Sequence, residues 1–414
     1  MGNLIIKNII INNFSQGLQF GSRWILNLVL ISVLSIEDFA VYSFVYSFSN
    51  ILLSVLPFGS SIFLISKDYN KTNNASILQD SILVVLFLAT IIILAFFILT
   101  PFLHSVKGWS YLIYGIVLSL MLSLNLVLFS YFKGLGKFRI ELFVYSFFSL
   151  FLLAFVGYLY FNPTTKPIEL IFSFLIILNL FVFVFTLIIT KKQTNILSLN
   201  TYKHAMKNSL AGFKVRKYFG FQEIVTAIYT QIGLLILFYL LDEATYGYYR
   251  ALFIIIAPIF MITVSISQVL LNKYKTIKNN PDYLVSFFRI TQKYTILSGI
   301  AICIFLFFLR DITLSYIGIE QNQSALISFY IIIVIILMRF VFSNYEMLLV
   351  ALDKQKQRFW IMLLSAVISV VLLFILLPQH GLVGAFSINA IAYFIVFVGT
   401  LILSETAFKR ITHK

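Results

Sequence analysis

Charged residues are scarce in this chain of 414 residues: they make up 11% of it, whereas 61% of the residues are hydrophobic. A soluble protein of this length cannot keep that balance, because its surface must carry charge to stay in water. Only one cysteine is present, Cys303, so an intrachain disulfide is excluded. Cys303 lies inside an apolar run, where we expect it to be a small packed residue.

The residues that carry common enzyme and metal chemistry are also missing. The chain has no Gly-x-x-x-x-Gly-Lys loop, which argues against ATP hydrolysis, and no paired-aspartate motif for a nucleotide sugar. No loop between apolar runs is long enough for a soluble catalytic domain. Four scattered histidines show no metal-ligand spacing: His104, His204, His380 and His413. We therefore predict no cofactor and no metal, and we expect that the protein is not an enzyme.

Apolar runs of near 20 residues recur along the chain. Such a run is long enough for an α-helix to cross about 30 Å of hydrocarbon. In lipid the backbone must form its hydrogen bonds within the segment, and barrel strands would be only about 10 residues long and alternating. We predict an all-α polytopic membrane protein with twelve transmembrane helices, at residues 11–33, 40–65, 79–101, 110–132, 141–161, 167–189, 217–240, 247–271, 287–309, 324–350, 358–377 and 382–403.

Lysine and arginine fall almost entirely on one set of connecting segments. Of the 30 such residues, 24 lie in the termini and every second loop, three lie in the alternate loops and three lie inside spans. Such an excess marks the cytoplasmic side, so we predict that both termini are cytoplasmic. The net charge of +15 is spread over these short segments and forms no basic domain, so we expect no nucleic-acid partner.

The twelve spans divide into two groups of six. We predict an N-terminal six-helix bundle at 1–190, a cytoplasmic basic linker at 191–216 and a C-terminal six-helix bundle at 217–414. Two halves of this kind are related by a pseudo-two-fold axis along the membrane normal. The charge of the linker predicts attraction to anionic membrane lipids.

Two pairs of short segments support an internal repeat. Residues 38–42 match residues 245–249 at a displacement of 207, and each segment follows an acidic turn. Residues 134–137, after the fourth span, match residues 351–354, after the tenth. Chance similarity among loops is the alternative, but half the chain length and the sidedness of the loops both agree with a repeat. We expect a binding site between the two halves.

The first span carries a polar stripe. Its members are spaced by 4, 3, 4 and 4 residues and so share one helix face: Asn12, Gln16, Gln19, Arg23 and Asn27. Arg23 lies about 18 Å along the helix from residue 11, close to mid-membrane. Hydrogen bonds between helices could explain some of these polar residues. Five of them in register around an arginine exceed what packing needs, so we predict that they line a lumen.

Four more charged residues lie within predicted spans: Arg250, Arg339, Glu223 and Glu346. Arginine suits bidentate contacts with phosphate, so a lumen with Arg23, Arg250 and Arg339 predicts an anionic substrate, such as a phosphate or pyrophosphate. Glu223 and Glu346 could couple an ion or pair with these arginines, since buried charges need partners. Snorkelling of Arg250 to the interface and an interfacial position for Glu346 remain open.

Three segments resemble the polysaccharide flippases (O-antigen type, Wzx-like) of the multidrug/oligosaccharidyl-lipid/polysaccharide exporter superfamily. Residues 34–42 read LSIEDFAVY, with Ala40 where that group usually has glycine. Residues 242–249 read DEATYGYY and keep the glycine, and residues 381–385 read GLVGA. Each segment is a weak signal, but the twelve spans and their 6+6 division match along the whole chain.

The resemblance implies a flippase in the bacterial inner membrane that moves an undecaprenyl-pyrophosphate-linked oligosaccharide, such as an O-antigen or capsule repeat unit, by alternating access. It also implies cationic residues in a central cavity, at the positions of Arg23 and Arg250. Other glycan-assembly membrane proteins would be further partners, besides the lipid-linked oligosaccharide and membrane lipids. A cation-coupled multidrug exporter of the same superfamily is the first alternative. A membrane glycan polymerase or glycosyltransferase is the alternative from another class.

Overall fold

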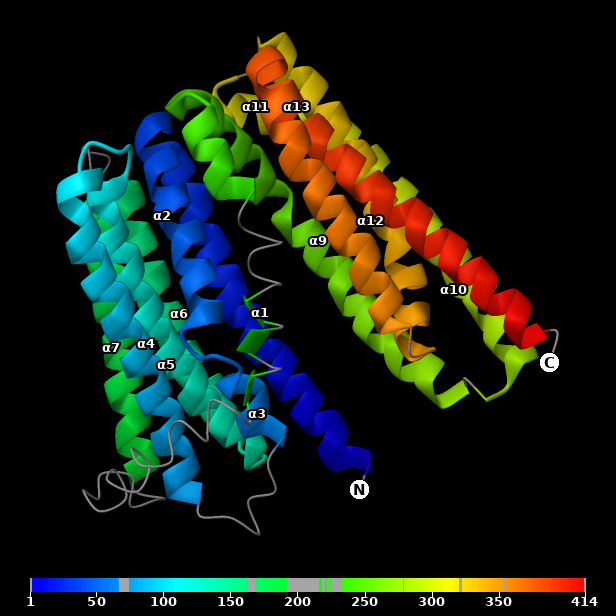
Figure 1. Cartoon of the computed structure of the whole chain (residues 1–414), viewed down its shortest axis with the longest axis horizontal. Helices are drawn as coiled ribbons and strands as arrows, with labels where there is room; N and C mark the ends of the chain where they lie inside the picture. Colours follow the sequence, from blue (N-terminus) through cyan, green and yellow to red (C-terminus); the bar gives the residue numbers. More distant parts are fainter. Residues whose placement is uncertain are drawn as a thin grey trace. The chain divides into compact units, whose positions relative to one another are not determined.

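The computed structural model describes ten stretches of the chain: 2–66, 74–162, 168–191, 216–217, 220–221, 223–224, 233–277, 279–319, 322–352 and 354–412. These residues form helices and contain no strand (Figure 1). Eight of the described helices are long and apolar enough to cross a membrane. The prediction of an all-α polytopic membrane protein is confirmed. Every predicted span except the seventh has its helix in the described part, whereas 217–240 lies mostly outside it.

Residues 1–236 form one compact unit, which we call the first unit. In it, α5 packs against α2, α3, α4 and α7, while α1 packs against α6. Of the apolar window of α5, 67% is buried, against 28% for α4, so α5 is central and α4 presents apolar side chains outward. The elements are α1 (Gly2–Val33), α2 (Ile36–Val55), α3 (Ser60–Ser66), α4 (Asn74–Leu103), the 3-10 turn η1 (Trp109–Tyr111), α5 (Leu112–Gly134), α6 (Phe138–Phe161) and α7 (Ile168–Lys191).

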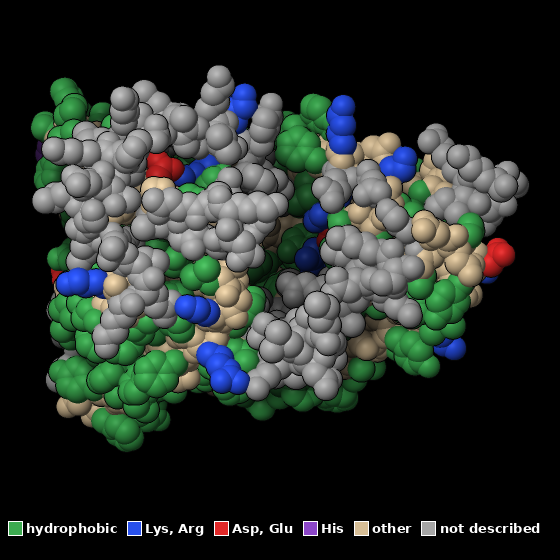
Figure 2. Space-filling model, turned by 90° about the horizontal axis from the view of Figure 1, so that it is seen from below, with side chains coloured by type: hydrophobic (Ala, Val, Ile, Leu, Met, Phe, Trp, Pro, Cys, Tyr) green, Lys and Arg blue, Asp and Glu red, His purple; other side chains and the backbone are tan. Residues whose placement is uncertain are grey.

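Residues 237–414 form the second unit. Its helices are α9 (Glu243–Ile277), α10 (Pro281–Phe308), α11 (Arg310–Ile317), α12 (Gln323–Ala351) and α13 (Gln355–Thr412). Here α12 is central, since α9, α10 and α13 all pack against it. Much of the described surface is hydrophobic, with isolated Lys and Arg side chains (Figure 2). In water such a surface would aggregate, but in lipid it is the expected exterior.

Helix α13 consists of two helices joined by a sharp turn at Gly381, whose φ and ψ are 48° and −122°. The two halves lie side by side (Figure 1), and the hydroxyl of Ser365 donates to the carbonyl of Ala392 at 3.0 Å. This turn separates the two predicted spans, 358–377 and 382–403. A Cβ on Gly384 would lie 2.9 Å from the carbonyl oxygen of Leu376, so the GLVGA segment needs both of its glycines for physical reasons.

The helix starts in the two units show the same local structure. Ser35 caps α2 by accepting from the backbone N–H of Asp38 at 3.1 Å. Asp242, displaced by 207 residues, accepts from the backbone N–H of Thr245 at 2.9 Å before α9. Such caps satisfy amide groups that have no partner within the helix. The matched segments, 38–42 and 245–249, thus each lie just after an equivalent helix cap, Ser35 or Asp242.

The same displacement relates two buried tyrosines. Tyr42 packs against Phe172 of α7 with ring centroids 5.3 Å apart, and Tyr249 packs against Phe386 of α13 at 4.7 Å. In the second matched pair, the N–H of Lys137 donates to the carbonyl of Phe132 at 2.8 Å. Likewise, the N–H of Lys354 donates to the carbonyl of Leu349 at 2.9 Å. Helix starts, packing and helix ends therefore all repeat between the units.

Replacing Gly381 by alanine should lower stability by about 1–3 kcal/mol, because a side chain is strained at positive φ. Thermal unfolding of the purified protein in detergent measures this. Gly157→Ala is the matched control, since Gly157 lies within α6 and a Cβ there meets no atom within 4 Å. That control should be neutral or stabilising by up to about 1 kcal/mol. Equal melting temperatures for the two variants would contradict the strained turn.

Candidate functional site

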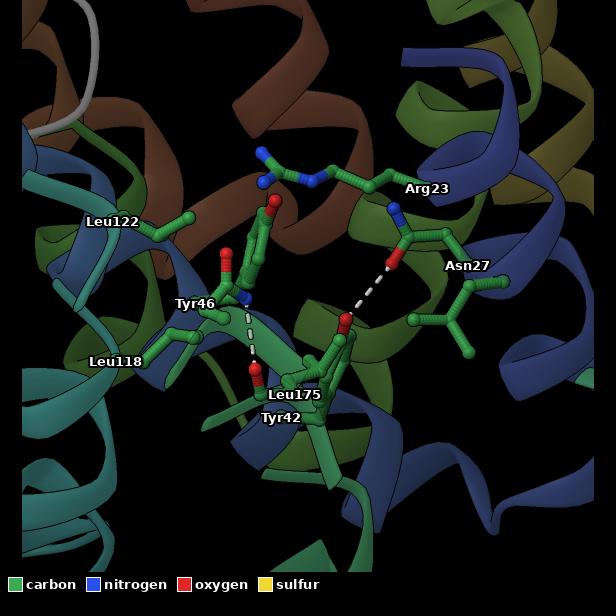
Figure 3. A pocket seen from close by; sticks show the side chains of 9 residues that line it. Arg23, Asn27, Tyr42, Tyr46, Leu118, Leu122 and Leu175 are labelled. Atoms are coloured by element: carbon green, nitrogen blue, oxygen red, sulfur yellow. Dashed lines mark hydrogen bonds between the residues drawn. The ribbon is translucent and has the colours of Figure 1, made fainter. Parts of the chain in front are cut away.

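The centre of α1 borders a pocket inside the first unit, between α1, α2, α5 and α7 (Figure 3). Arg23 and Asn27 contribute from α1 and point into the pocket, and the guanidinium of Arg23 is directed toward Tyr46 of α2. The lining is polar on one side and apolar on the other, and consists of Arg23, Leu26, Asn27, Tyr42, Tyr46, Leu118, Leu122, Leu175 and Asn179.

The polar groups of this pocket are largely bound to one another. The hydroxyl of Tyr42 donates to Oδ1 of Asn27 at 3.2 Å. The side-chain amide of Asn179 donates to the backbone carbonyl of Leu175 at 2.8 Å. The backbone carbonyl of Asn179 accepts from the side-chain amide of Asn125 at 3.0 Å. These bonds hold the amides and the tyrosine in place, so the site is pre-organised around Arg23.

Arg23 itself has no acidic partner among the described residues. Its guanidinium carbon lies 5.5 Å from the centroid of the Phe148 ring on α6. Helix α1 is a predicted span, although it is not among the eight described helices apolar enough to cross a membrane by composition. Within a span, a cation is costly unless it meets water, an anion or another partner. The pocket itself is small, about 10 Å³, but an anionic group beside the guanidinium of Arg23 would supply the missing counter-ion.

The structure divides the predicted stripe of α1 between two neighbours. Arg23 and Asn27 reach the pocket, whereas Gln19 donates to the hydroxyl of Tyr145 on α6 at 2.8 Å. Gln16 is partly exposed on the same helix, and the side chain of Asn12 lies outside the described residues. The stripe thus serves both helix packing and the pocket.

Arg250 lies in the second unit, near the start of α9. Its Nε atom is buried and has no hydrogen-bond partner, and no described carboxylate pairs with it. The adjacent Tyr249 accepts from Nδ2 of Asn389 at 2.7 Å. Arg23 in the first unit and Arg250 in the second thus both lack a described counter-ion.

Arg339 is in a different position, because its charge is neutralised. Glu346, two turns further along α12 and only 3% exposed, accepts from Nη1 of Arg339 at 3.1 Å. The other oxygen of Glu346 accepts from Nε of Arg358 on α13, also at 3.1 Å. This cluster ties α12 to α13 inside the second unit.

Glu223 supports a break in the backbone between α2 and α3. It accepts from the N–H of Gly59 at 2.9 Å and from the hydroxyl of Ser61 at 2.7 Å. The chain here has positive φ at Phe58 (44°) and Gly59 (74°), which leaves the N–H of Gly59 without an intrahelical partner. The carboxylate of Glu223 replaces the missing carbonyl.

Sequence reasoning missed a buried ion pair beside this break. Arg216 is 1% exposed, pairs with Asp80 of α4 and donates to the hydroxyl of Ser60 at 2.9 Å. Its guanidinium also lies 4.6 Å from the centroid of the Phe63 ring. Arg216 reads as the last basic residue of a cytoplasmic linker. The one available signal was Asp80, an acid next to a long apolar run.

Three solved structures show what this fold is similar to. The lipid II flippase MurJ, in an inward closed conformation, aligns with a TM-score of 0.67 at 17% identity, over 98% of this chain and 90% of that one. An inward-facing multidrug resistance MATE family transporter of the MOP superfamily has a TM-score of 0.66 at 13% identity, over 98% and 99% of the two chains.

The third is a MOP superfamily transporter from Pyrococcus furiosus, described as having a binding pocket of reverse polarity that suggests a different function. It aligns with a TM-score of 0.66 at 11% identity, over 99% of this chain and 96% of that one. No family model and no curated protein matches the sequence. At these identities the likeness establishes the fold, which is that of the MOP superfamily transporters.

The ion pair of Arg216 and Asp80 should contribute to the stability of the packing at the start of α4. Arg216→Met alone should lower the free energy of unfolding by about 3–5 kcal/mol, because it leaves a carboxylate buried without its partner. The double variant Arg216→Met/Asp80→Leu should recover most of that loss, since two packed apolar groups replace the pair. Chemical denaturation in detergent micelles would show it. A double variant no more stable than the single one would contradict this interpretation.

The three-residue cluster of α12 and α13 has its own expected behaviour. Glu346→Gln should destabilise the second unit by about 2–4 kcal/mol, because two guanidinium groups then face each other without the carboxylate between them. Adding Arg358→Gln should restore part of the loss, and melting temperatures of the single and double variants measure the effect. If Glu346→Gln melts as the parent does, the cluster does not hold these helices together.

Proposed function

We propose that this chain is a membrane transporter that moves a lipid-linked oligosaccharide across the bilayer, with the pyrophosphate of the carrier bound by arginine. The observation that carries the proposal is Arg23, a cation within the first predicted span that borders a small pocket with hydrogen-bonded polar groups and has no described counter-ion. Arginine binds phosphate oxygens in pairs, and such charge-assisted bonds are strong in a site of low dielectric.

The second unit supports an anionic substrate independently. Arg250 also has no described carboxylate partner, and its Nε is buried without a hydrogen bond. Arg339, by contrast, is neutralised by Glu346 and belongs to a structural cluster. We therefore assign substrate contact to Arg23 and Arg250 first, with Asn27 as a polar neighbour of Arg23. Arg339 would take part only if Glu346 released it.

The mechanism that we propose is alternating access. In the inward-open state the pyrophosphate head meets Arg23 and its polar neighbours, while the lipid tail stays in the bilayer. Closing the cytoplasmic side and opening the outer side then releases the head group outside. We place the chain in the bacterial inner membrane with both termini in the cytoplasm, as the excess of Lys and Arg predicts. The likeness to the lipid II flippase MurJ fits a lipid-linked substrate.

Export of drugs is the second candidate, because a multidrug resistance MATE transporter aligns almost as well as MurJ. A cation-coupled exporter would place acidic groups at its substrate site. Glu223 is the acid that could serve, but both of its oxygens accept hydrogen bonds, from Gly59 and Ser61. The P. furiosus neighbour is described as having a pocket of reverse polarity, so pocket polarity within this fold is tied to function. Unpaired arginines favour the anionic substrate.

Deleting the gene in its host should trap lipid-linked glycan on the cytoplasmic leaflet and remove it from the cell surface. Restoring the chain with Arg23→Ala should lower export by about tenfold or more, since a charge-assisted hydrogen bond contributes about 1.5–3 kcal/mol. Arg23→Lys should recover part of the rate, because the charge returns without the planar fork. Glycan in each leaflet and at the surface is the measurement.

Arg139→Ala is the matched control, because Arg139 is exposed on α6 and lies outside the pocket. It should export at the parental rate and should reach the membrane in the same amount as Arg23→Ala. Unchanged surface glycan in the deletion strain, together with a rise in drug sensitivity, would overturn the flippase proposal and favour the exporter.

A further inference from the structure

A second pocket lies entirely in the second unit, where α10, α12 and α13 meet. Its volume is about 400 Å³, and it opens to the surface as a groove. The lining combines cations, one acid, an amide, aromatic rings and aliphatic chains: Phe288, Arg289, Gln292, Lys293, Ile296, Leu297, Tyr345 and Glu405. None of these residues belongs to the pocket around Arg23 or to the cluster around Glu346.

The lining changes from charged to apolar along α10. Arg289 and Lys293 are exposed and lie one turn apart, so their Cβ atoms are about 6 Å apart on one helix face. The next turn contributes Ile296 and Leu297. On the adjoining face, Ile290 and Tyr294 are 56% and 66% exposed, as expected for a surface that meets lipid. A ligand that fills this groove must itself be charged at one end and apolar at the other.

The cations of the groove are available for a ligand. No ion pair or hydrogen bond joins Arg289 or Lys293 to any described residue. The amide of Gln292 is already used, since it donates to the carbonyl of Val341 at 3.0 Å and accepts from Asn344 at 2.9 Å. Two cations against the single carboxylate of Glu405 leave the groove with a net positive charge.

The inner wall of the groove consists of packed aromatic side chains. Phe288 and Tyr345 stand 5.0 Å apart between ring centroids, and Phe288 also contacts Phe408 of α13 at 5.1 Å. Phe288 and Phe408 belong to a buried cluster that includes Tyr274, Leu284 and Leu348. The inner wall therefore belongs to the core of the second unit, and the two cations lie beside it on helix α10.

We propose that this groove binds one anionic phospholipid, with its phosphate between Arg289 and Lys293 and an acyl chain along Ile296 and Leu297. A soluble phosphate would use the charged rim but not the apolar continuation, and a zwitterionic lipid would gain less from a net positive groove. Since α10 begins on the side that the Lys and Arg distribution predicts to be cytoplasmic, the lipid comes from the inner leaflet. The site is independent of the transported substrate.

Lipid binding to the purified full-length protein tests this, by native mass spectrometry with added phosphatidylglycerol or phosphatidylcholine of identical acyl chains. The parent protein should retain one phosphatidylglycerol more tightly than phosphatidylcholine. Arg289→Ala/Lys293→Ala should weaken that binding by about 25-fold, because each cation near anionic lipid contributes about fivefold. Glu405→Gln should strengthen it by about fivefold, since the one acid of the groove is removed.

Two further variants separate the site from general charge effects and from misfolding. Arg139→Ala/Lys356→Ala removes two exposed cations that lie outside the groove and should bind as the parent does. Arg289→Lys/Lys293→Arg keeps both charges and should retain binding. Equal affinity for the two lipids, equal weakening by the Arg139/Lys356 variant, or weaker binding in Glu405→Gln would each overturn the proposal. If Arg23→Ala loses glycan export but still binds phosphatidylglycerol as the parent does, the result supports a lipid site that is separate from transport.

Discussion

Hydrocarbon offers no hydrogen-bond partner to the peptide backbone, so each place where a helix breaks inside the membrane needs a substitute. The break between α2 and α3 has one, because the carboxylate of Glu223 accepts from the N–H of Gly59. Beside it, Arg216 binds Asp80 and Ser60. The carboxylate of Glu223 accepts the hydrogen bond that a carbonyl accepts in an unbroken helix. The start of the seventh predicted span is thereby attached to α3 and α4 of the first unit.

A buried charge also needs a partner, and by this criterion the basic residues fall into two groups. Some are neutralised within their unit: Lys133 pairs with Glu141 at 2.9 Å, joining α5 to α6, and Arg358 and Arg339 share Glu346, joining α13 to α12. The fourth and fifth spans of each half are thus joined by an ion pair, but with the charges exchanged. Arg23 and Arg250 have no described acid, and only such residues remain free to bind an anion.

Fold and substrate rest on different kinds of observation. The likeness to MurJ and to a MATE transporter fixes the arrangement of helices, and it is equally good for a lipid flippase and a drug transporter. Choice of substrate depends on a few side chains in pockets that the fold leaves open to variation. In our proposal those side chains are the arginine, asparagine and tyrosine of the pocket around Arg23.

The sequence alone determined the helical class, the spans and the repeat, because length, hydropathy and loop charge act locally and are read directly along the chain. It also identified Arg23 and Asn27 as partners on one face of α1. It could not separate Gln19, which bonds to Tyr145, from that pocket, nor find the pair of Arg216 and Asp80. Arg289 and Lys293 read only as loop charge, although they border a groove. These contacts join residues far apart in the chain, so only the packing of helices decided them.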